Sequence, residues 1–333
     1  MHIGLCYDLR ADYLAAGFAP EDVAEFDSEE TLGAIESALA RLGHQPERIG
    51  NARRLCERLA GGARWDLVFN IAEGLYGRCR EAQAPALLEL YDIPYTFSDP
   101  LTCALTLDKA LAKRLVRAAG LNTPADLLVA DPAAAVQAAA RVPGPWFIKP
   151  NTEGTGKGID GQSRVEQAAD LAPRIQRLLM LYRQPVLVES YLPGREFTVG
   201  IVGTGAHARP LGCMEILIRP DAPNQDYTYD IKDCYEQYVT YERPAENELR
   251  AELETLALAA YRVLECRDAG RVDLRLDANG RPAFMEVNPL AGLHPRHSDL
   301  PMIARQEGGS FDQLIATIVA SARERMPAQV IAA

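Results

Sequence analysis

Residues 149–158 read Lys-Pro-Asn-Thr-Glu-Gly-Thr-Gly-Lys-Gly and begin at the end of an apolar run that predicts a buried strand at 146–149. Three glycines within five residues allow backbone N–H groups to approach an anion closely, and Lys149 and Lys157 add positive charge. The segment is not a Walker A loop, because Gly158 stands where Ser or Thr should follow the lysine. A phosphate-binding loop and a flexible glycine turn are both open at this point.

Oxygen-bearing side chains recur on two segments far downstream. Residues 271–276 and 283–288 predict the strands of a hairpin, joined by the turn sequence Asp-Ala-Asn-Gly. Glu286 and Asn288 lie on one face of the second strand, and hairpin pairing brings Asp273 within reach of them. Two carboxylates and an amide suit Mg²⁺ that is shared with phosphate groups. Solvated acids on an edge strand are the alternative.

Other charged residues extend this chemistry. Arg271 precedes Asp273 by two positions and so faces the same way, where it can stabilise negative charge that develops during group transfer or simply form a salt bridge. Glu189 and Glu196 bracket a turn at residues 191–195. A carboxylate there can accept hydrogen bonds from a ribose diol, although surface acids need no function.

Composition excludes several classes of protein. A length of 333 residues suits two or three packed subdomains, and a net charge of −11 argues against a nucleic-acid partner. The seven cysteines show no C-x-x-C pair, which argues against zinc and against a disulfide framework. The first ten residues are charged too soon for a signal peptide, and no apolar run approaches the roughly 18 residues of a membrane span. We therefore expect a cytoplasmic protein with small-molecule partners and no membrane.

Hydrophobic periodicity predicts alternating strands and helices over the first hundred residues, hence a parallel α/β layer. We expect strands at residues 2–7, 65–71, 94–97, 124–129, 146–149, 185–190, 196–202, 271–276 and 283–288. We expect helices that begin near Ser28 and span 82–91, 108–119, 132–142, 246–264 and 310–325.

Together and in this order, these segments resemble the ATP-grasp superfamily, and within it the D-alanine–D-alanine ligases. The similarity runs from about Trp65 to the C-terminus, and five motifs in register are far more specific than any one alone. The motifs are Leu-Thr-Leu-Asp-Lys at 105–109, the glycine segment at 148–158, Val-Glu-Ser-Tyr-Leu-Pro-Gly-Arg-Glu-Phe-Thr-Val at 188–199, Gly-Arg-Val-Asp at 270–273, and Met-Glu-Val-Asn at 285–288 followed by Gly292.

The resemblance implies an α/β protein with the ATP-grasp fold, in which the nucleotide lies between the central and C-terminal of three subdomains. An N-terminal substrate subdomain would span residues 1–104, a central subdomain 105–188, and a C-terminal subdomain with the metal and oxyanion site 189–333. ATP and Mg²⁺ would be the cofactors, with Mn²⁺ as a substitute, and a homodimer is an open alternative to a monomer.

The resemblance also implies residue roles. The catalytic residues would be Lys232 on a mobile loop, with Arg271 and the Gly292 N–H as an oxyanion site. The metal ligands would be Asp273, Glu286 and Asn288. The nucleotide would contact Lys109, Lys149, Glu153, Gly154, Thr155, Gly156, Lys157, Gly158, Glu189, Leu192 and Glu196.

The chain departs from the family pattern in the regions that bind substrate. The first strand leads into residues 7–10, Tyr-Asp-Leu-Arg, without the family's glycine-rich loop. We therefore expect recognition by Glu73, Arg78, Arg296 and Ser298, with Glu73 taking an ammonium group and the arginines taking carboxylates.

The sequence thus predicts an ATP-dependent carboxylate–amine ligase that forms an amide bond between small amino-acid-like substrates through an acyl phosphate. A specialised pathway is preferred over cell-wall synthesis because of these departures. An authentic D-alanine–D-alanine ligase is the alternative in the same class. A non-catalytic nucleotide-binding protein is the alternative in another class.

Overall fold

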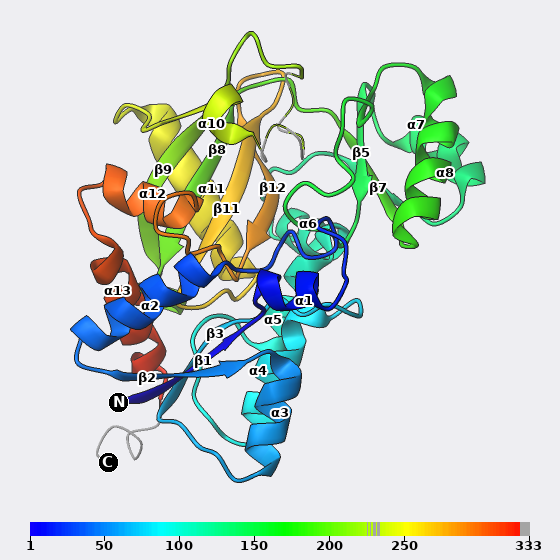
Figure 1. Cartoon of the computed structure of the whole chain (residues 1–333). Coiled ribbons are helices and arrows are strands. Elements are labelled where there is room, and N and C mark those ends of the chain that lie inside the picture. The colour runs from blue at the N-terminus through cyan, green and yellow to red at the C-terminus, as the bar shows by residue number, and fades with distance from the viewer. Residues whose placement is uncertain (225, 227, 229–230, 232–233, 327–333) are drawn as a thin grey trace.

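The computed structural model describes residues 1–224, 226, 228, 231 and 234–326, and the chain is built around three sheets. Figure 1 shows one sheet near the N-terminus, a large sheet beside it, and a third sheet set apart with its own helices. The expected α/β class is confirmed. No helix in the described part of the chain combines the length and hydrophobicity that a bilayer crossing requires.

The N-terminal sheet has the strand order β2-β1-β3, and both pairings are parallel, as the sequence predicts. The expected strand at residues 94–97 is wrong, because only Tyr95 bridges to β3. Phe97 has a φ of 71°, which turns the backbone out of extended geometry. The elements are β1 (His2–Tyr7), α1 (Arg10–Ala15), α2 (Glu29–Arg41), β2 (Gln45–Gly50), α3 (Ala52–Ala60), β3 (Leu67–Ile71), the 3-10 turn η1 (Arg80–Ala82), α4 (Gln83–Leu90) and α5 (Pro100–Leu107).

The central sheet has the order β4-β7-β5-β6 and is antiparallel throughout. Its helices α7 and α8 pack on it through an apolar cluster that includes Trp146, Ile148 and Ile175. Helix α6 begins at Asp108, whose side chain caps the Leu111 N–H. The elements are α6 (Lys109–Ala118), β4 (Asp126–Val129), α7 (Ala135–Arg141), β5 (Trp146–Pro150), β6 (Arg164–Val165), α8 (Leu171–Tyr182) and β7 (Val186–Ser190).

The C-terminal sheet has five strands in the order β10-β9-β8-β11-β12, all antiparallel. Helix α11 covers it through an apolar cluster centred on the fully buried Tyr261. The elements are β8 (Glu196–Val202), β9 (Arg209–Ile218), α10 (Tyr235–Tyr238), β10 (Val239–Glu242), α11 (Glu248–Val263), β11 (Ala269–Leu276), β12 (Pro282–Asn288), α12 (Asp299–Gln306) and α13 (Phe311–Glu324).

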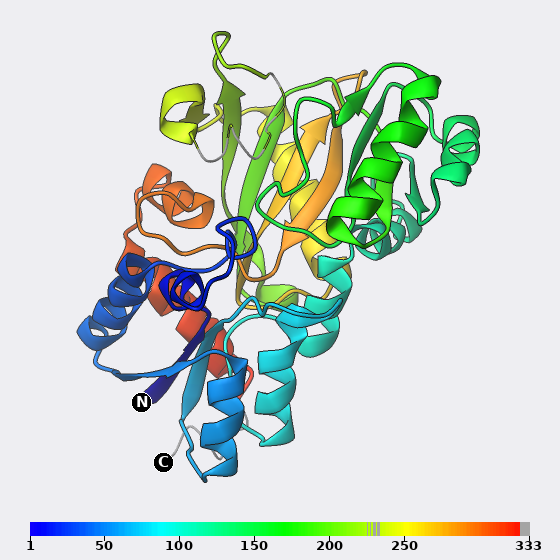
Figure 2. The ribbon, with the colours of Figure 1, turned by 45° about the vertical axis from the view of Figure 1, so that its right-hand side comes forward.

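The last helix, α13, packs against elements of the N-terminal sheet region. In Figures 1 and 2, α13 runs beside α2, and both contribute to one apolar core with β1. The buried Asp268 carboxylate accepts hydrogen bonds from Arg325 and Ser321 near the end of the chain and from the Phe97 N–H. The three-part division at residues 104/105 and 188/189 stays a prediction, and its second boundary falls inside β7.

Candidate active site

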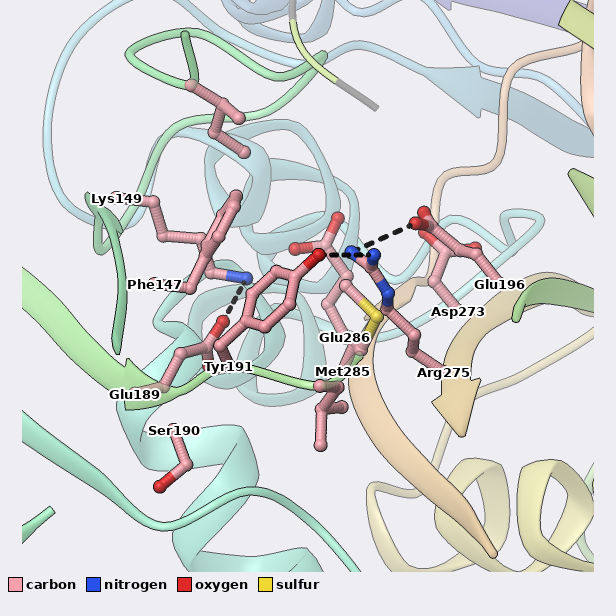
Figure 3. A pocket seen from close by; sticks show the side chains of 12 residues that line it. Phe147, Lys149, Glu189, Ser190, Tyr191, Glu196, Asp273, Arg275, Met285 and Glu286 are labelled. Atoms are coloured by element: carbon pink, nitrogen blue, oxygen red, sulfur yellow. Dashed lines mark hydrogen bonds and ion pairs between the residues drawn. The ribbon is translucent and has the colours of Figure 1, made fainter. Parts of the chain in front are cut away.

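A narrow pocket opens between the central sheet and the C-terminal sheet (Figure 3). One wall comes from β5 and β7 and the turn after β7, and the opposite wall comes from β8, β11 and β12. Apolar and charged side chains alternate around it, which suits a ligand with an apolar ring and a charged tail. The lining residues are Phe147, Lys149, Ile159, Glu189, Ser190, Tyr191, Leu192, Glu196, Asp273, Arg275, Met285 and Glu286.

Glu189 lies between two buried lysines. Its carboxylate is 3.0 Å from Lys149 Nζ, as Figure 3 shows, and 2.9 Å from Lys113 Nζ. Burial raises the pKa of Glu189, but the two lysines lower it by more, so that it lies below its usual value. Burial also lowers the pKa of Lys149, but Glu189, Glu286 and Glu196 together outweigh this, and the pKa is raised. Two cations for one anion leave this wall with a positive excess that can accept phosphate.

On the other side of the pocket, Arg275 links Tyr191 to Glu196. Its guanidinium donates to the Tyr191 hydroxyl at 3.0 Å and lies 3.7 Å from the Glu196 carboxylate (Figure 3). The Tyr191 ring stacks near Phe147, with 6.3 Å between ring centroids. These contacts fix an aromatic edge of the pocket beside a carboxylate.

The hairpin of β11 and β12 carries the predicted metal ligands. Its register places Asp273 opposite Glu286 and Arg271 opposite Asn288. The Asn288 amide donates to Asp273 at 3.3 Å, and Arg271 Nη1 donates to the same carboxylate at 2.6 and 2.7 Å. Lys109 Nζ lies 3.7 Å from Glu286. Two carboxylates and one amide side by side form an oxygen-only donor set, so these residues fit Mg²⁺.

The glycine segment forms a tight loop after β5. Gly156 and Gly158 have φ angles of 79° and 76°, and a Cβ at Gly158 would lie 2.5 Å from the Pro150 ring, so glycine is required there. Lys157 pairs with Glu153 at 2.7 Å, and the Glu153 carbonyl accepts from Lys109 Nζ at 2.5 Å. The loop therefore brings its amides and both lysines to the same place.

Glu25, from the segment between α1 and α2, holds this loop. Its Oε1 accepts from the Gly154 N–H at 2.7 Å and lies 3.1 Å from Lys157 Nζ. Its Oε2 pairs with Arg80 at 2.9 Å, and both side chains are only 8% exposed. Burial opposes ionisation of Glu25, but Arg80 and Lys157 lower its pKa to about 2. A backbone amide and a lysine of the loop thus already bind an anion, which is the task expected of them with phosphate.

A second cavity, of about 690 Å³, adjoins the hairpin on the N-terminal side. Arg271 and Asn288 line it, whereas their strand neighbours Asp273 and Glu286 line the narrow pocket. The cavity is rich in acidic residues. Its lining consists of Arg10, Ala24, Glu25, Phe26, Asp27, Ser28, Glu30, Thr31, Glu73, Glu81, Gly154, Thr155, Tyr235, Tyr241, Arg271, Asn288, Pro289, Leu290, Gly292, His294, His297, Ser298 and Asp299.

The predicted substrate residues divide into two groups. Glu73 and Ser298 line the large cavity. Arg78 does not line it and pairs with Asp108 at 2.6 Å, and Arg296 pairs with Glu30 at 2.6 Å with 69% of its side chain exposed. Lys232 lies outside the described residues.

The sequence reasoning missed several residues of the site. Lys113 follows Lys109 by one helical turn on α6, and that spacing is a signal that could have found it. Glu25, Glu81 and Arg80 come from segments without a motif, and only the fold brings them to the glycine loop and the large cavity.

Comparison with known proteins gives the family. A family model described as D-ala D-ala ligase C-terminus matches residues 116–320. A D-alanine–D-alanine ligase of Bordetella petrii is 35% identical over 290 residues, which cover 86% of this chain and 85% of that protein. The chain belongs to the D-alanine–D-alanine ligase family. It is therefore an ATP-dependent ligase that forms a C–N bond between small-molecule substrates.

Solved structures of low identity share the fold. A D-alanine–D-alanine ligase of Bacillus anthracis has a TM-score of 0.74 at 21% identity and covers 97% of this chain and 98% of its own. The VanG D-Ala:D-Ser ligase of Enterococcus faecalis also has a TM-score of 0.74 at 21% identity, covering 96% of this chain and 99% of its own. The predicted ATP-grasp fold is confirmed.

We predict that Glu25→Gln loosens the glycine loop. The substitution leaves the buried Arg80 with a neutral partner and leaves Lys157 with Glu153 as its one carboxylate partner among the described residues, so the free energy of unfolding should fall by roughly 3 kcal/mol. Hydrogen exchange of the amides of residues 154–158 should accelerate by the same argument. Because the pKa of Glu25 is lowered in the folded state, this stabilisation is present above about pH 4.5, the group's ordinary value, and is lost as the pH falls toward about 2.

The matched control for this prediction is Glu21→Gln. Glu21 belongs to the same segment but is exposed and accepts a single hydrogen bond from the Tyr182 hydroxyl. The Glu21→Gln substitution should leave the free energy of unfolding in urea and the hydrogen exchange of the loop amides near their wild-type values. Wild-type exchange and stability in Glu25→Gln at pH 7 would refute the role of Glu25.

Proposed function

We propose that the protein uses ATP and Mg²⁺ to join a carboxylate and an amine, both amino-acid-like, in a pathway other than cell-wall synthesis. The observation that carries this proposal is the position of one hairpin between two cavities. Asp273 and Glu286 line the narrow pocket, and Arg271 and Asn288 line the large one. A phosphoryl group held at this hairpin would meet a substrate held on its other side.

The narrow pocket is proposed to hold ATP. The ring would lie beside Phe147, Tyr191 and Leu192, and Glu196 would accept from the ribose hydroxyls. Lys109, Lys149 and the amides of residues 153–158 would bind the phosphates, as the positive wall and the anion already bound by the loop support. Glu189 would then act by holding Lys149 in place rather than by contacting adenine, because its carboxylate is already bound by two lysines.

Asp273, Glu286 and Asn288 are proposed to hold Mg²⁺ together with the phosphates. Mg²⁺ bound there would offset the negative charge of the transferring phosphoryl group. The chain's own lysines lie on the same side of the hairpin, with Lys109 at 3.7 Å from Glu286. The carboxylates, through Mg²⁺, and Lys109 are thus arranged to hold a polyanion from the same side.

The proposed reaction has two steps. A substrate carboxylate oxygen forms a bond to the γ-phosphorus as the bond to ADP breaks, which gives an acyl phosphate. The amine nitrogen of the second substrate then bonds to the acyl carbon, phosphate leaves, and the amine gives up its proton. Arg271 and the Gly292 N–H line the cavity in which this occurs and would stabilise the oxyanion.

Two observations bear on the substrates. Relatives at about 35% identity carry the name D-alanine–D-alanine ligase, which favours the cell-wall reaction as the second candidate. The structural neighbours include one protein named for D-alanine alone and one named for D-alanine and D-serine, so the fold does not fix the second substrate. The acidic cavity of this chain supports the specialised reading.

We predict that Glu286→Gln lowers the rate of ADP release by at least about 10²-fold, because it removes a charged ligand from the metal site. Excess Mg²⁺ should restore part of the rate. Glu252→Gln, which changes an exposed glutamate of α11, is the control and should keep the wild-type rate. The comparison is made by coupled ADP assay after circular dichroism has shown equal folding. A wild-type rate in Glu286→Gln at limiting Mg²⁺ would remove this residue from the site.

A second prediction separates the two candidate reactions. If the protein acts outside cell-wall synthesis, ATP and Mg²⁺ with D-alanine as the only amino acid should give ADP release no faster than the rate without substrate. Mixtures of other amino acids should increase the rate of ADP release. Formation of D-alanyl-D-alanine, detected by mass, at a rate equal to the best mixed pair would establish the cell-wall reaction instead.

A further inference from the structure

The large cavity contains carboxylates of two kinds. Three of the six acids that line it have basic partners: Glu25 pairs with Arg80 and Lys157, Glu30 pairs with Arg296, and Asp299 lies 3.3 Å from Arg271. A fourth, Asp27, interacts with the Thr31 side chain. Glu73 and Glu81 differ, because neither has a hydrogen bond or ion pair from its side chain to another residue that the structure describes.

Glu81 is the more unusual of the two. It lies on the 3-10 turn before α4, it is only 8% exposed, and it lines the cavity. A carboxylate with so little exposure and no donor among the described residues is costly, because it has lost most of its contact with bulk water and no protein group replaces that contact. A cost of this kind is typical of sites that a ligand completes.

The electrostatics of the pair support this view. Burial raises the pKa of Glu81 to about 7; the positive charge of Arg80 opposes this shift, and the negative charge of Glu25 adds to it. Burial likewise raises the pKa of Glu73, and so do the negative charges of Glu81 and Glu25. Glu81 therefore acts on Glu73, and a cation placed beside both carboxylates would offset the cost of burial and the repulsion together.

A metal ion is not the cation that fits. Over the described ranges, no group of three acidic, histidine or cysteine side chains is arranged to hold a metal. An ammonium or guanidinium group has several N–H donors and matches carboxylate acceptors without needing a third acidic ligand. The same cavity is lined by Arg10, whose buried Nε has no acceptor within the described part of the chain, so an anionic group can also bind there.

We propose that Glu73 and Glu81 form a subsite for a positively charged side chain, so that one of the ligated substrates is a basic amino acid or a similar diamine. A neutral amino acid brings one ammonium group and leaves one of the two carboxylates without a partner. A substrate with a second cationic group satisfies both. This inference rests on the proposed function, because it assigns the substrate class of the same cavity.

The test compares lysine and ornithine with their uncharged counterparts norleucine and norvaline, each in both configurations. Binding is measured by calorimetry to the full-length protein saturated with Mg²⁺ and a non-hydrolysable ATP analogue. Lysine or ornithine of one configuration should bind at least about tenfold tighter than the uncharged counterpart, since leaving a buried charge unpaired costs on that order.

The isosteric variants Glu73→Gln and Glu81→Gln should each reduce this preference, and the double variant should bring it within about twofold of parity by the same reasoning. Glu30→Gln changes another acid of the cavity, one that already pairs with Arg296, and should keep the preference. Should a variant fail to fold, the wild-type comparison alone still decides.

Equal wild-type affinity for lysine and norleucine, or no measurable binding of any basic amino acid, overturns the proposal. A preference for lysine over norleucine that persists in the Glu73→Gln/Glu81→Gln double variant also overturns the proposal. ADP release distinguishes the two levels of inference. Turnover of neutral amino acids without a preference for basic ones refutes the subsite and leaves the ligase, whereas selective binding of lysine without ADP release from any pair refutes the ligase and leaves the subsite.

Discussion

The pairing of β11 with β12 is the constraint on which the rest of the site depends. Its register sets Asp273 opposite Glu286 and Arg271 opposite Asn288. A slip of one residue would turn every one of these side chains to the other face of the sheet. The first pair lines the narrow pocket and the second pair lines the large cavity. Two positions along each strand therefore separate the proposed nucleotide site from the proposed substrate site.

Around this hairpin, charge compensation differs between the two cavities. In the narrow pocket, Glu189 is held between Lys113 and Lys149, and the buried charges stabilise one another. In the large cavity, Glu73 and Glu81 interact electrostatically with Arg80 but have no ion pair with a residue that the structure describes. A protein tolerates uncompensated buried charge where a ligand supplies the missing partner, and this contrast separates the part of the site that is complete from the part that awaits substrate.

Much of the nucleotide side could be predicted from sequence because its signals are local. The glycine loop, the period-two spacing of Glu286 and Asn288, and the turn at residues 277–280 all lie within short segments. Even here, sequence spacing could not show that Glu189 on β7 would lie between two lysines, because Lys113 reaches it from helix α6.

The substrate side was harder to predict because the fold assembles it from distant segments. Arg78 and Arg296 look like carboxylate binders in sequence, but Asp108 and Glu30 already neutralise them. Glu25 and Glu81 carry no motif, and they become significant only when the segment between α1 and α2, η1 and the glycine loop meet. Segments that pair through tertiary contacts leave no periodic signal in the sequence.

The central claim is that ATP cleavage in this protein is coupled to amide formation. The most direct measurement is the ratio of ADP released to amide product formed, with product quantified by mass spectrometry across pairs of amino acids. Coupled ligation predicts one ADP for each amide bond with at least one pair, and little ADP release when the amine substrate is left out. ADP release that is independent of added amino acids, with no amide product from any pair, would contradict the account.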